Sequence, residues 1–228
     1  HSNRRRTQNR QTDNQAFATA KDCVKIARCL FLTALTMNPI NDAGQLLITF
    51  IFGFIVFLFL LRILLQLCRV DFRTPIAQFV ATLTNPVTIP LSRLIPRVGR
   101  LDTPAALVLL IAKWLELILL WVTAGVTLNV GGAALWAVAE ILDLTVTVFM
   151  FAIVIQIILS WVSPMGGDPL TSTLRQLTAP ILVPLRNLIP PVGMFDLSPM
   201  VAILALLLTR TLITAPMVSA GAQLALGG

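Results

Sequence analysis

The side chains that could support chemistry are few, and the most unusual of them are charges inside apolar segments. Lys113 and Glu116 are one helical turn apart near the middle of one apolar run, and Arg210 lies near the middle of another. Charges within a membrane span are costly to bury and commonly mark an ion or proton path. They can also join helices to one another. We favour this second interpretation, because no chain of charges continues across the bilayer.

Candidates for catalytic residues are scarce. The single histidine is His1, and the three cysteines (Cys23, Cys29 and Cys68) have no Cys-x-x-Cys spacing. The sequence contains no Gly-x-Ser-x-Gly motif and no glycine-rich phosphate loop. We therefore expect a protein that is not an enzyme and that has no catalytic, cofactor-binding or metal site.

The composition indicates which elements must position these side chains. Of 228 residues, 57% are hydrophobic and 12% charged, and the mean hydropathy is +0.87. A small core cannot hide so many apolar side chains. Apolar runs long enough to cross a bilayer occur at about 45–67, 103–126, 135–162 and 198–220. The sequence predicts an all-α membrane protein of about four transmembrane helices, in which Arg62 snorkels and Glu140 and Asp143 reach the interface.

Basic residues predict the orientation of these spans. The connections after the first and third runs carry Arg69, Arg73, Arg93, Arg97, Arg100, Arg175 and Arg186. By the positive-inside rule, both connections face the cytoplasm and both termini lie outside. The net charge of +7 does not indicate nucleic-acid binding, because seven of the 17 Lys and Arg residues fall within the first 28 positions.

Three regions follow along the chain. Residues 1–36 are polar and basic, and Met37 leads into the first run. We expect translation to begin at Met37 and residues 1–36 to be a non-native or upstream extension; a disordered native tail is the alternative. Residues 37–130 form a first membrane repeat, called the first half below, and residues 131–228 a second, called the second half.

An internal repeat defines these halves. Residues 74–102 resemble residues 168–196 at an offset of 94, with twelve identities among the 28 positions 75–102. The shared motif residues are Pro86, Pro90, Pro96, Gly99 and Asp102, matched by Pro180, Pro184, Pro190, Gly193 and Asp196.

The repeat predicts a short helix between the spans of each half. Pro75 and Pro169 suit a first helical turn, and the apolar stripes that follow are too short to span, so the helix should lie in the membrane interface. The later prolines should break it into two pieces. Each half is then span, broken interfacial helix, span, and the halves are parallel repeats about an axis along the membrane normal.

At the doubled element Pro86–Asp102 and Pro180–Asp196, and at the adjoining 155–164 and 196–200, the sequence resembles the YggT (YlmG) family of small bacterial membrane proteins with plastid relatives. The resemblance covers about Met37 to Gly228. It implies an inner-membrane protein linked to osmotic stress tolerance, to division or nucleoid distribution, or to cytochrome assembly in plastids. Where the family often has two adjacent basic residues, this chain has Ser92-Arg93 and Arg186-Asn187, which weakens a model of a basic pair that binds an anion.

Two functions remain open. The first is a scaffold or assembly factor whose cytoplasmic amphipathic platform contacts anionic headgroups or an unidentified protein partner through Arg93, Arg97, Arg100, Arg175 and Arg186. The second is a channel or transporter in osmotic adaptation. Four spans are few for a pore, so this alternative requires a homo-oligomer.

Overall fold

The structure is a computed structural model that describes residues 39–93, 95, 102–124, 129–162, 168–188 and 196–226. Residues up to Leu46 form a unit separate from Leu47–Gly228, and the packing below is that of the second unit. Several predictions lie outside the described residues: those for residues 1–36, Pro96, Arg97, Gly99, Arg100, Pro190 and Gly193.

Four long apolar helices dominate the described chain, as predicted. They are α2 (Pro39–Leu67), α4 (Thr103–Ala124), α5 (Val130–Val162) and a composite of α7 (Ser198–Thr209), the π-helical turn η1 (Arg210–Thr214) and α8 (Ala215–Leu226). All four are long and apolar enough to cross a membrane. Across the described ranges every regular element is helical.

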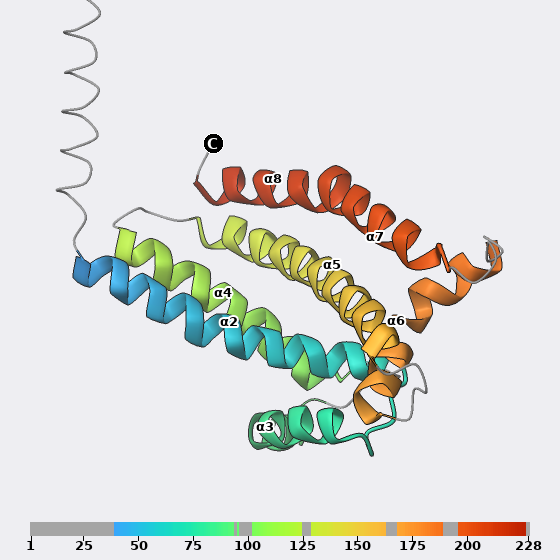
Figure 1. Ribbon diagram of the computed structural model, residues 1–228. Coiled ribbons are helices and arrows are strands. Elements are labelled where there is room, and N and C mark those ends of the chain that lie inside the picture. The colour runs from blue at the N-terminus through green and yellow to red at the C-terminus, as the bar shows by residue number, and fades with distance from the viewer. Residues whose placement is uncertain are drawn as a thin grey trace, which may run out of the picture. The chain divides into compact units, whose positions relative to one another are not determined.

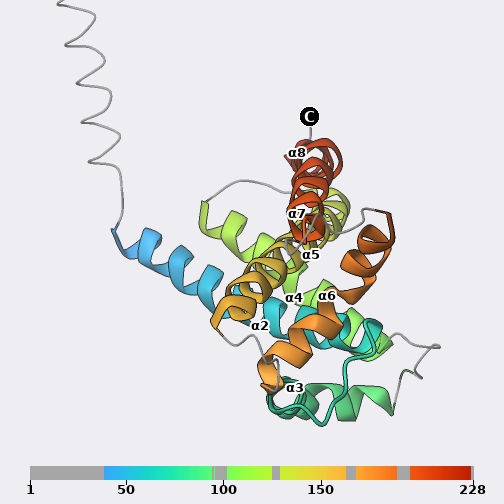
Figure 2. The ribbon, with the colours of Figure 1, turned by 45° about the vertical axis from the view of Figure 1, so that its right-hand side comes forward.

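Two shorter helices connect these spans. α3 (Pro75–Ser92) and α6 (Pro169–Leu188) begin at the predicted prolines, 94 residues apart. The prediction that each is broken in two is wrong, because each runs as one helix through its internal prolines. Figure 2 shows α6 bending partway along its length, as expected where proline removes a backbone donor.

The core lies where the short helices meet the spans (Figure 1). Its largest cluster joins α2, α4 and α5 to both short helices, through Val80 of α3 and Leu177 of α6 among others. A second, smaller cluster joins α5, α6 and α7 around Ile153, Leu182 and Ala202. The two short helices also contact each other.

Glycine allows α5 and α8 to approach closely. A Cβ on Gly132 would lie 2.5 Å from the backbone nitrogen of Ala225, and a Cβ on Gly221 would lie 2.8 Å from the Cα of Trp136. Small residues at such contacts are typical of helix pairs in membranes, where close packing replaces the hydrophobic effect.

Most span surface is left outside this core. Between 11% and 28% of the apolar window in each span is buried. In water so much exposed apolar surface would be a liability, so it must contact lipid or further protein. These four helices make the chain a multi-pass membrane protein.

Candidate functional site

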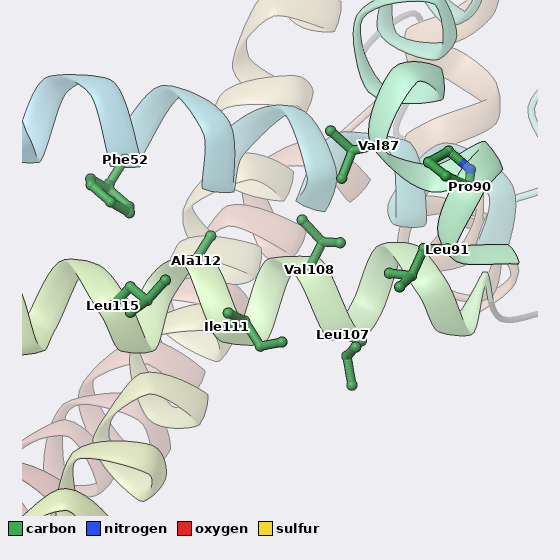
Figure 3. A pocket seen from close by; sticks show the side chains of 9 residues that line it. All are labelled: Phe52, Val87, Pro90, Leu91, Leu107, Val108, Ile111, Ala112 and Leu115. Atoms are coloured by element: carbon green, nitrogen blue, oxygen red, sulfur yellow. The ribbon is translucent and has the colours of Figure 1, made fainter. Parts of the chain in front are cut away.

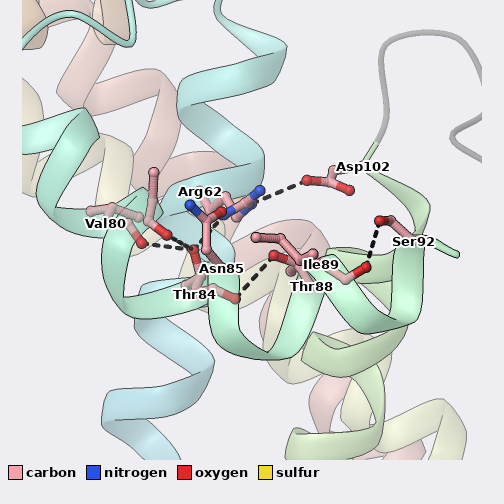
Figure 4. A network of polar contacts seen from close by, with 9 residues as sticks. Arg62, Val80, Thr84, Asn85, Thr88, Ile89, Ser92 and Asp102 are labelled. Carbon is pink, nitrogen blue, oxygen red and sulfur yellow. Dashed lines mark hydrogen bonds and ion pairs between the residues drawn. The ribbon is translucent and has the colours of Figure 1, made fainter.

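A buried arginine joins three elements of the first half (Figure 4). The Nε of Arg62, on α2, donates to a carboxylate oxygen of Asp102 at 3.1 Å. Its Nη1 donates to the Thr84 hydroxyl at 2.6 Å and to the Asn85 side-chain oxygen at 2.9 Å, both on α3. We call these four residues the first junction.

The sequence accounts for the parts of this junction. Asp102 immediately precedes α4, and its carbonyl accepts the first helical hydrogen bond, from Ala106, at 2.9 Å. The Thr84 hydroxyl donates to the carbonyl of Val80 at 2.7 Å, so its lone pairs remain available to Arg62. The prediction that Arg62 snorkels is wrong: the residue is 7% exposed. Three acceptors in one place stabilise the guanidinium better than a long reach to water.

The second half has a different junction at matching positions. Gln156 of α5 lies 94 residues after Arg62 and accepts a short hydrogen bond from the hydroxyl of Thr178, the counterpart of Thr84. Asp196, the counterpart of Asp102, instead binds the Nε of Arg186 of α6 at 2.9 Å. We call Gln156, Thr178, Arg186 and Asp196 the second junction. Both members of its ion pair are exposed, at 46% and 38% of their side-chain surface.

Asp196 is also held by the helix that follows it. The backbone N–H of Ser198, the first residue of α7, donates to its carboxylate at 2.9 Å. Partial burial acts to raise the pKa of Asp196, but the hydrogen bonds of Ser198 and the charge of Arg186 outweigh it. The pKa therefore lies below its ordinary value.

The charges within the spans form two separate groups. Lys113 of α4 pairs with Glu116 at 3.2 Å, as the spacing predicted, and with Glu140 of α5 at 2.9 Å. Arg210 pairs elsewhere, donating to both oxygens of Asp143 at 3.1 and 3.2 Å.

The second group includes the π-helical turn. Thr214, at the end of η1, adds its hydroxyl to Asp143 at 2.7 Å. Glu140 and Asp143 thus bind the basic partners Lys113 and Arg210 on neighbouring helices; that they reach the interface stays a prediction. A membrane interior favours such pairing because water offers no competing partner.

The remaining predicted site residues lie on the short helices. Pro86 and Pro90 of α3, and Pro180 and Pro184 of α6, are all exposed. Arg93 is exposed at the C-terminal end of α3, and Arg175 is exposed on α6. No group of three His, Cys, Asp or Glu side chains lies close enough to hold a metal ion in the part of the chain that the structure describes.

The first half also contains an apolar pocket (Figure 3). Its volume is 480 Å³, and it lies between α2, α3 and α4. Phe52, Val87 and Leu115 are among its lining side chains. With no polar side chain in the lining, the pocket can hold hydrocarbon but cannot select a headgroup.

Sequence reasoning missed the junctions themselves. Extending the offset of 94 into the spans would have aligned Arg62 with Gln156, a signal that was available. No sequence signal indicated that Glu140 would meet Lys113, because that contact depends on how two helices dock.

The chain is 34% identical over 181 residues to an uncharacterized protein of Pseudomonas aeruginosa, covering 78% of this chain and 91% of the relative. It is 34% identical over 168 residues to an uncharacterized protein of Vibrio alginolyticus (72% and 90%), and 35% identical over 147 residues to the uncharacterized protein YggT of Escherichia coli (64% and 76%). No solved structure matches the chain. The model of the CCB3/YggT family matches residues 42–123 and 135–217, and the chain belongs to that family.

Proposed function

We propose that the protein is an inner-membrane scaffold or assembly factor whose helices α3 and α6 present an amphipathic platform on the cytoplasmic side. The observation that carries the proposal is the outward face of α3. Phe79 is 61% exposed and Leu83 is also exposed, whereas the inward face is formed by Ala77, Val80 and threonines. A soluble surface would have the opposite arrangement.

The platform has the fixed support that docking needs. The first junction ties α3 to two spans through the buried guanidinium of Arg62. The backbone N–H of Asp71, after α2, donates to the side chain of Gln176 on α6 at 3.0 Å. A rigid apolar face with arginines at its edge suits a partner protein or an anionic membrane surface.

The proposal is tested by placing one charge on each side of that face. Phe79→Asp should abolish function while the protein remains inserted, because an apolar contact surface gains a carboxylate; an aspartate costs about 3 kcal/mol at a span centre and somewhat less at the interface. Gln78→Asp, at the adjacent exposed polar position, is the matched control and should be tolerated. Growth under osmotic stress and crosslinking to neighbouring proteins are the measurements. Equal effects of the two changes would count against the platform.

The charges within the spans are the observation that supports the alternative function, a channel or transporter. Replacing Lys113, Glu116 and Glu140 together by Leu removes the whole first group without leaving an unpaired charge, which is often close to neutral for stability. The platform predicts that this triple variant retains function. A triple variant that is abundant and inserted but inactive, together with ion flux in liposomes that it abolishes, would establish the conduit instead.

The orientation that we propose places both termini outside and α3 and α6 at the cytoplasmic face. After replacement of the native cysteines, a cysteine at Gly131 should react with an impermeant reagent added outside, and one at Ser92 or Asn187 should not. Removal of Cys68 simplifies the background, although burial already raises the pKa of its thiol and slows its labelling. The reverse pattern of labelling would invert the proposed orientation.

A further inference from the structure

A cavity of 660 Å³ lies beside the second junction, between α5, α6 and the start of α7. Its polar lining comprises Gln156, Ser160, Thr171, Arg175, Arg186 and Asp196. Its apolar lining includes Ile153, Ile157 and Leu182. The cavity is therefore amphipathic, unlike the apolar pocket of the first half.

One buried hydroxyl in this cavity has no partner. Thr171 is 4% exposed, and its Oγ1 makes no hydrogen bond within the described residues. The nearby Thr173 and Thr178 behave differently, because the hydroxyl of Thr173 donates to the carbonyl of Pro169 at 2.8 Å and the hydroxyl of Thr178 donates to the side-chain oxygen of Gln156. A buried hydroxyl without a partner is costly unless something else supplies one. Thr171 is thus positioned to donate to a ligand in the cavity.

The charges around the cavity favour an anion. Arg175 and Arg186, both on α6, line the cavity. Asp196 neutralises Arg186 by accepting a hydrogen bond from its Nε. The other guanidinium nitrogens of Arg186 remain available. Arg175 makes no side-chain hydrogen bond or ion pair inside the described ranges. Two cations against one carboxylate leave a net charge of +1.

The matching region of the first half lacks these groups. At an offset of 94, Ala77 stands for Thr171, Ala81 for Arg175 and Ser92 for Arg186. In the first junction the guanidinium of Arg62 contacts Thr84. In the second junction the shorter side chain of Gln156 takes the matching place beside Thr178. The space and its polar lining are therefore specific to the second half.

We propose that this cavity binds the phosphate-bearing headgroup of an anionic phospholipid. The phosphate oxygens accept hydrogen bonds from Thr171, Arg175 and Arg186, and an acyl chain runs along Ile153 and Ile157. The exposed ring of Trp161 at the rim suits the headgroup layer. This inference rests on the proposed membrane platform and names the lipid that its second half recognises.

The test measures lipid binding to the purified full chain in detergent. Phosphatidylglycerol and phosphatidylcholine with the same acyl chains are titrated, and the shift in unfolding midpoint gives an apparent affinity. Phosphatidylglycerol should bind at least about tenfold more tightly, and Thr171→Val and Arg175→Gln should each weaken it about tenfold, the value of one hydrogen bond to a charged group. Arg73→Gln removes the same charge from the exposed turn before α3, outside the cavity, and should leave phosphatidylglycerol binding unchanged.

The lipid-free protein provides a second readout. Thr171→Val should unfold at the same or a higher temperature than wild type without lipid, because it replaces an unpartnered hydroxyl by a methyl group. Equal binding of both lipids, or an equal loss in Arg73→Gln and Arg175→Gln, would overturn the proposal. Displacement of phosphatidylglycerol by free glycerol phosphate at equal concentration would overturn it in favour of a soluble anion.

Failure of this inference can be distinguished from failure of the platform. Phe79→Asp lies on α3, outside the cavity, and should bind phosphatidylglycerol like wild type even where it abolishes function. A protein that binds no lipid selectively, yet loses function in Phe79→Asp and not in Gln78→Asp, would retain the platform and lose the lipid site.

Discussion

In the first half the arginine comes from a membrane span, and in the second it comes from the short helix. Arg62 reaches Asp102 from α2 and is buried among three acceptors. Arg186 reaches Asp196 from α6 and remains half exposed. An aspartate before the second span of each half is common to both: Asp102 precedes α4, and Asp196 precedes α7. The element that supplies the cation decides whether the junction is sealed or stays open beside a cavity.

This difference also predicts different energies. A buried pair contributes little net stability when intact, but it is expensive to break, because the remaining charge is left without water. An exposed pair is screened and is worth between about 0 and 1 kcal/mol. The first junction should therefore cost more to break than the second.

The largest expected effect is the loss of the buried ion pair between Arg62 and Asp102. Arg62→Leu leaves Asp102 buried without its guanidinium and should destabilise the protein by about 3–5 kcal/mol. Arg186→Leu, the matched change in the second half, should cost at most about 1 kcal/mol. Thermal unfolding in detergent and abundance in membranes measure both. Similar losses in the two variants would remove the distinction between a sealed and an open junction.

A smaller effect is expected when the first junction is copied into the second half. Gln156→Arg supplies a guanidinium beside Thr178 and Asp196, and should stabilise the protein by about 1 kcal/mol, a typical net value for an added hydrogen bond. The longer side chain should also occupy the cavity and weaken phosphatidylglycerol binding about tenfold. Unfolding midpoints with and without lipid measure the two effects. Unchanged lipid binding in this variant would show that the missing arginine is not what opens the cavity.

The spans and the starts of the short helices could be predicted from sequence, for physical reasons that act locally. The bilayer fixes the length of an apolar run, and the four predicted runs agree with the helices. Pro75 and Pro169 lack a donor that the first helical turn does not need, and both short helices begin there. Neither inference requires knowledge of a distant partner.

The effect of the internal prolines could not be judged in the same way. Pro86 and Pro90 are four residues apart and share the exposed face of α3, as Pro180 and Pro184 do on α6. The lost donors therefore fall on one side of the helix, and the hydrogen bonds of the buried side continue through them. A bend follows rather than an end. The face that a proline occupies depends on tertiary packing.

Distant partners explain the other errors. Arg62 meets a carboxylate 40 residues away, and Asp143 meets Arg210 at a distance of 67 residues. An arginine near a span end reads as a snorkelling side chain until the fold brings an acceptor to it. The sequence repeat contained the needed comparison, but interpretation of the pair Arg62 and Gln156 required knowing that Thr84 and Thr178 lie opposite them.

The π-helical turn in the last span affects how that span is phased along its length. Its hydrogen bonds reach five residues back rather than four, so η1 contains one residue more than an α-helical turn. If the same sequence continued as an uninterrupted α-helix, every side chain after Thr214 would be rotated by about 100°. Gly221 would then turn away from Trp136, although Ala202 could still pack against α5 and α6. The extra residue of η1 therefore lets both ends of the last span face their partners: Ala202 packs against α5 and α6, and Gly221 packs against Trp136.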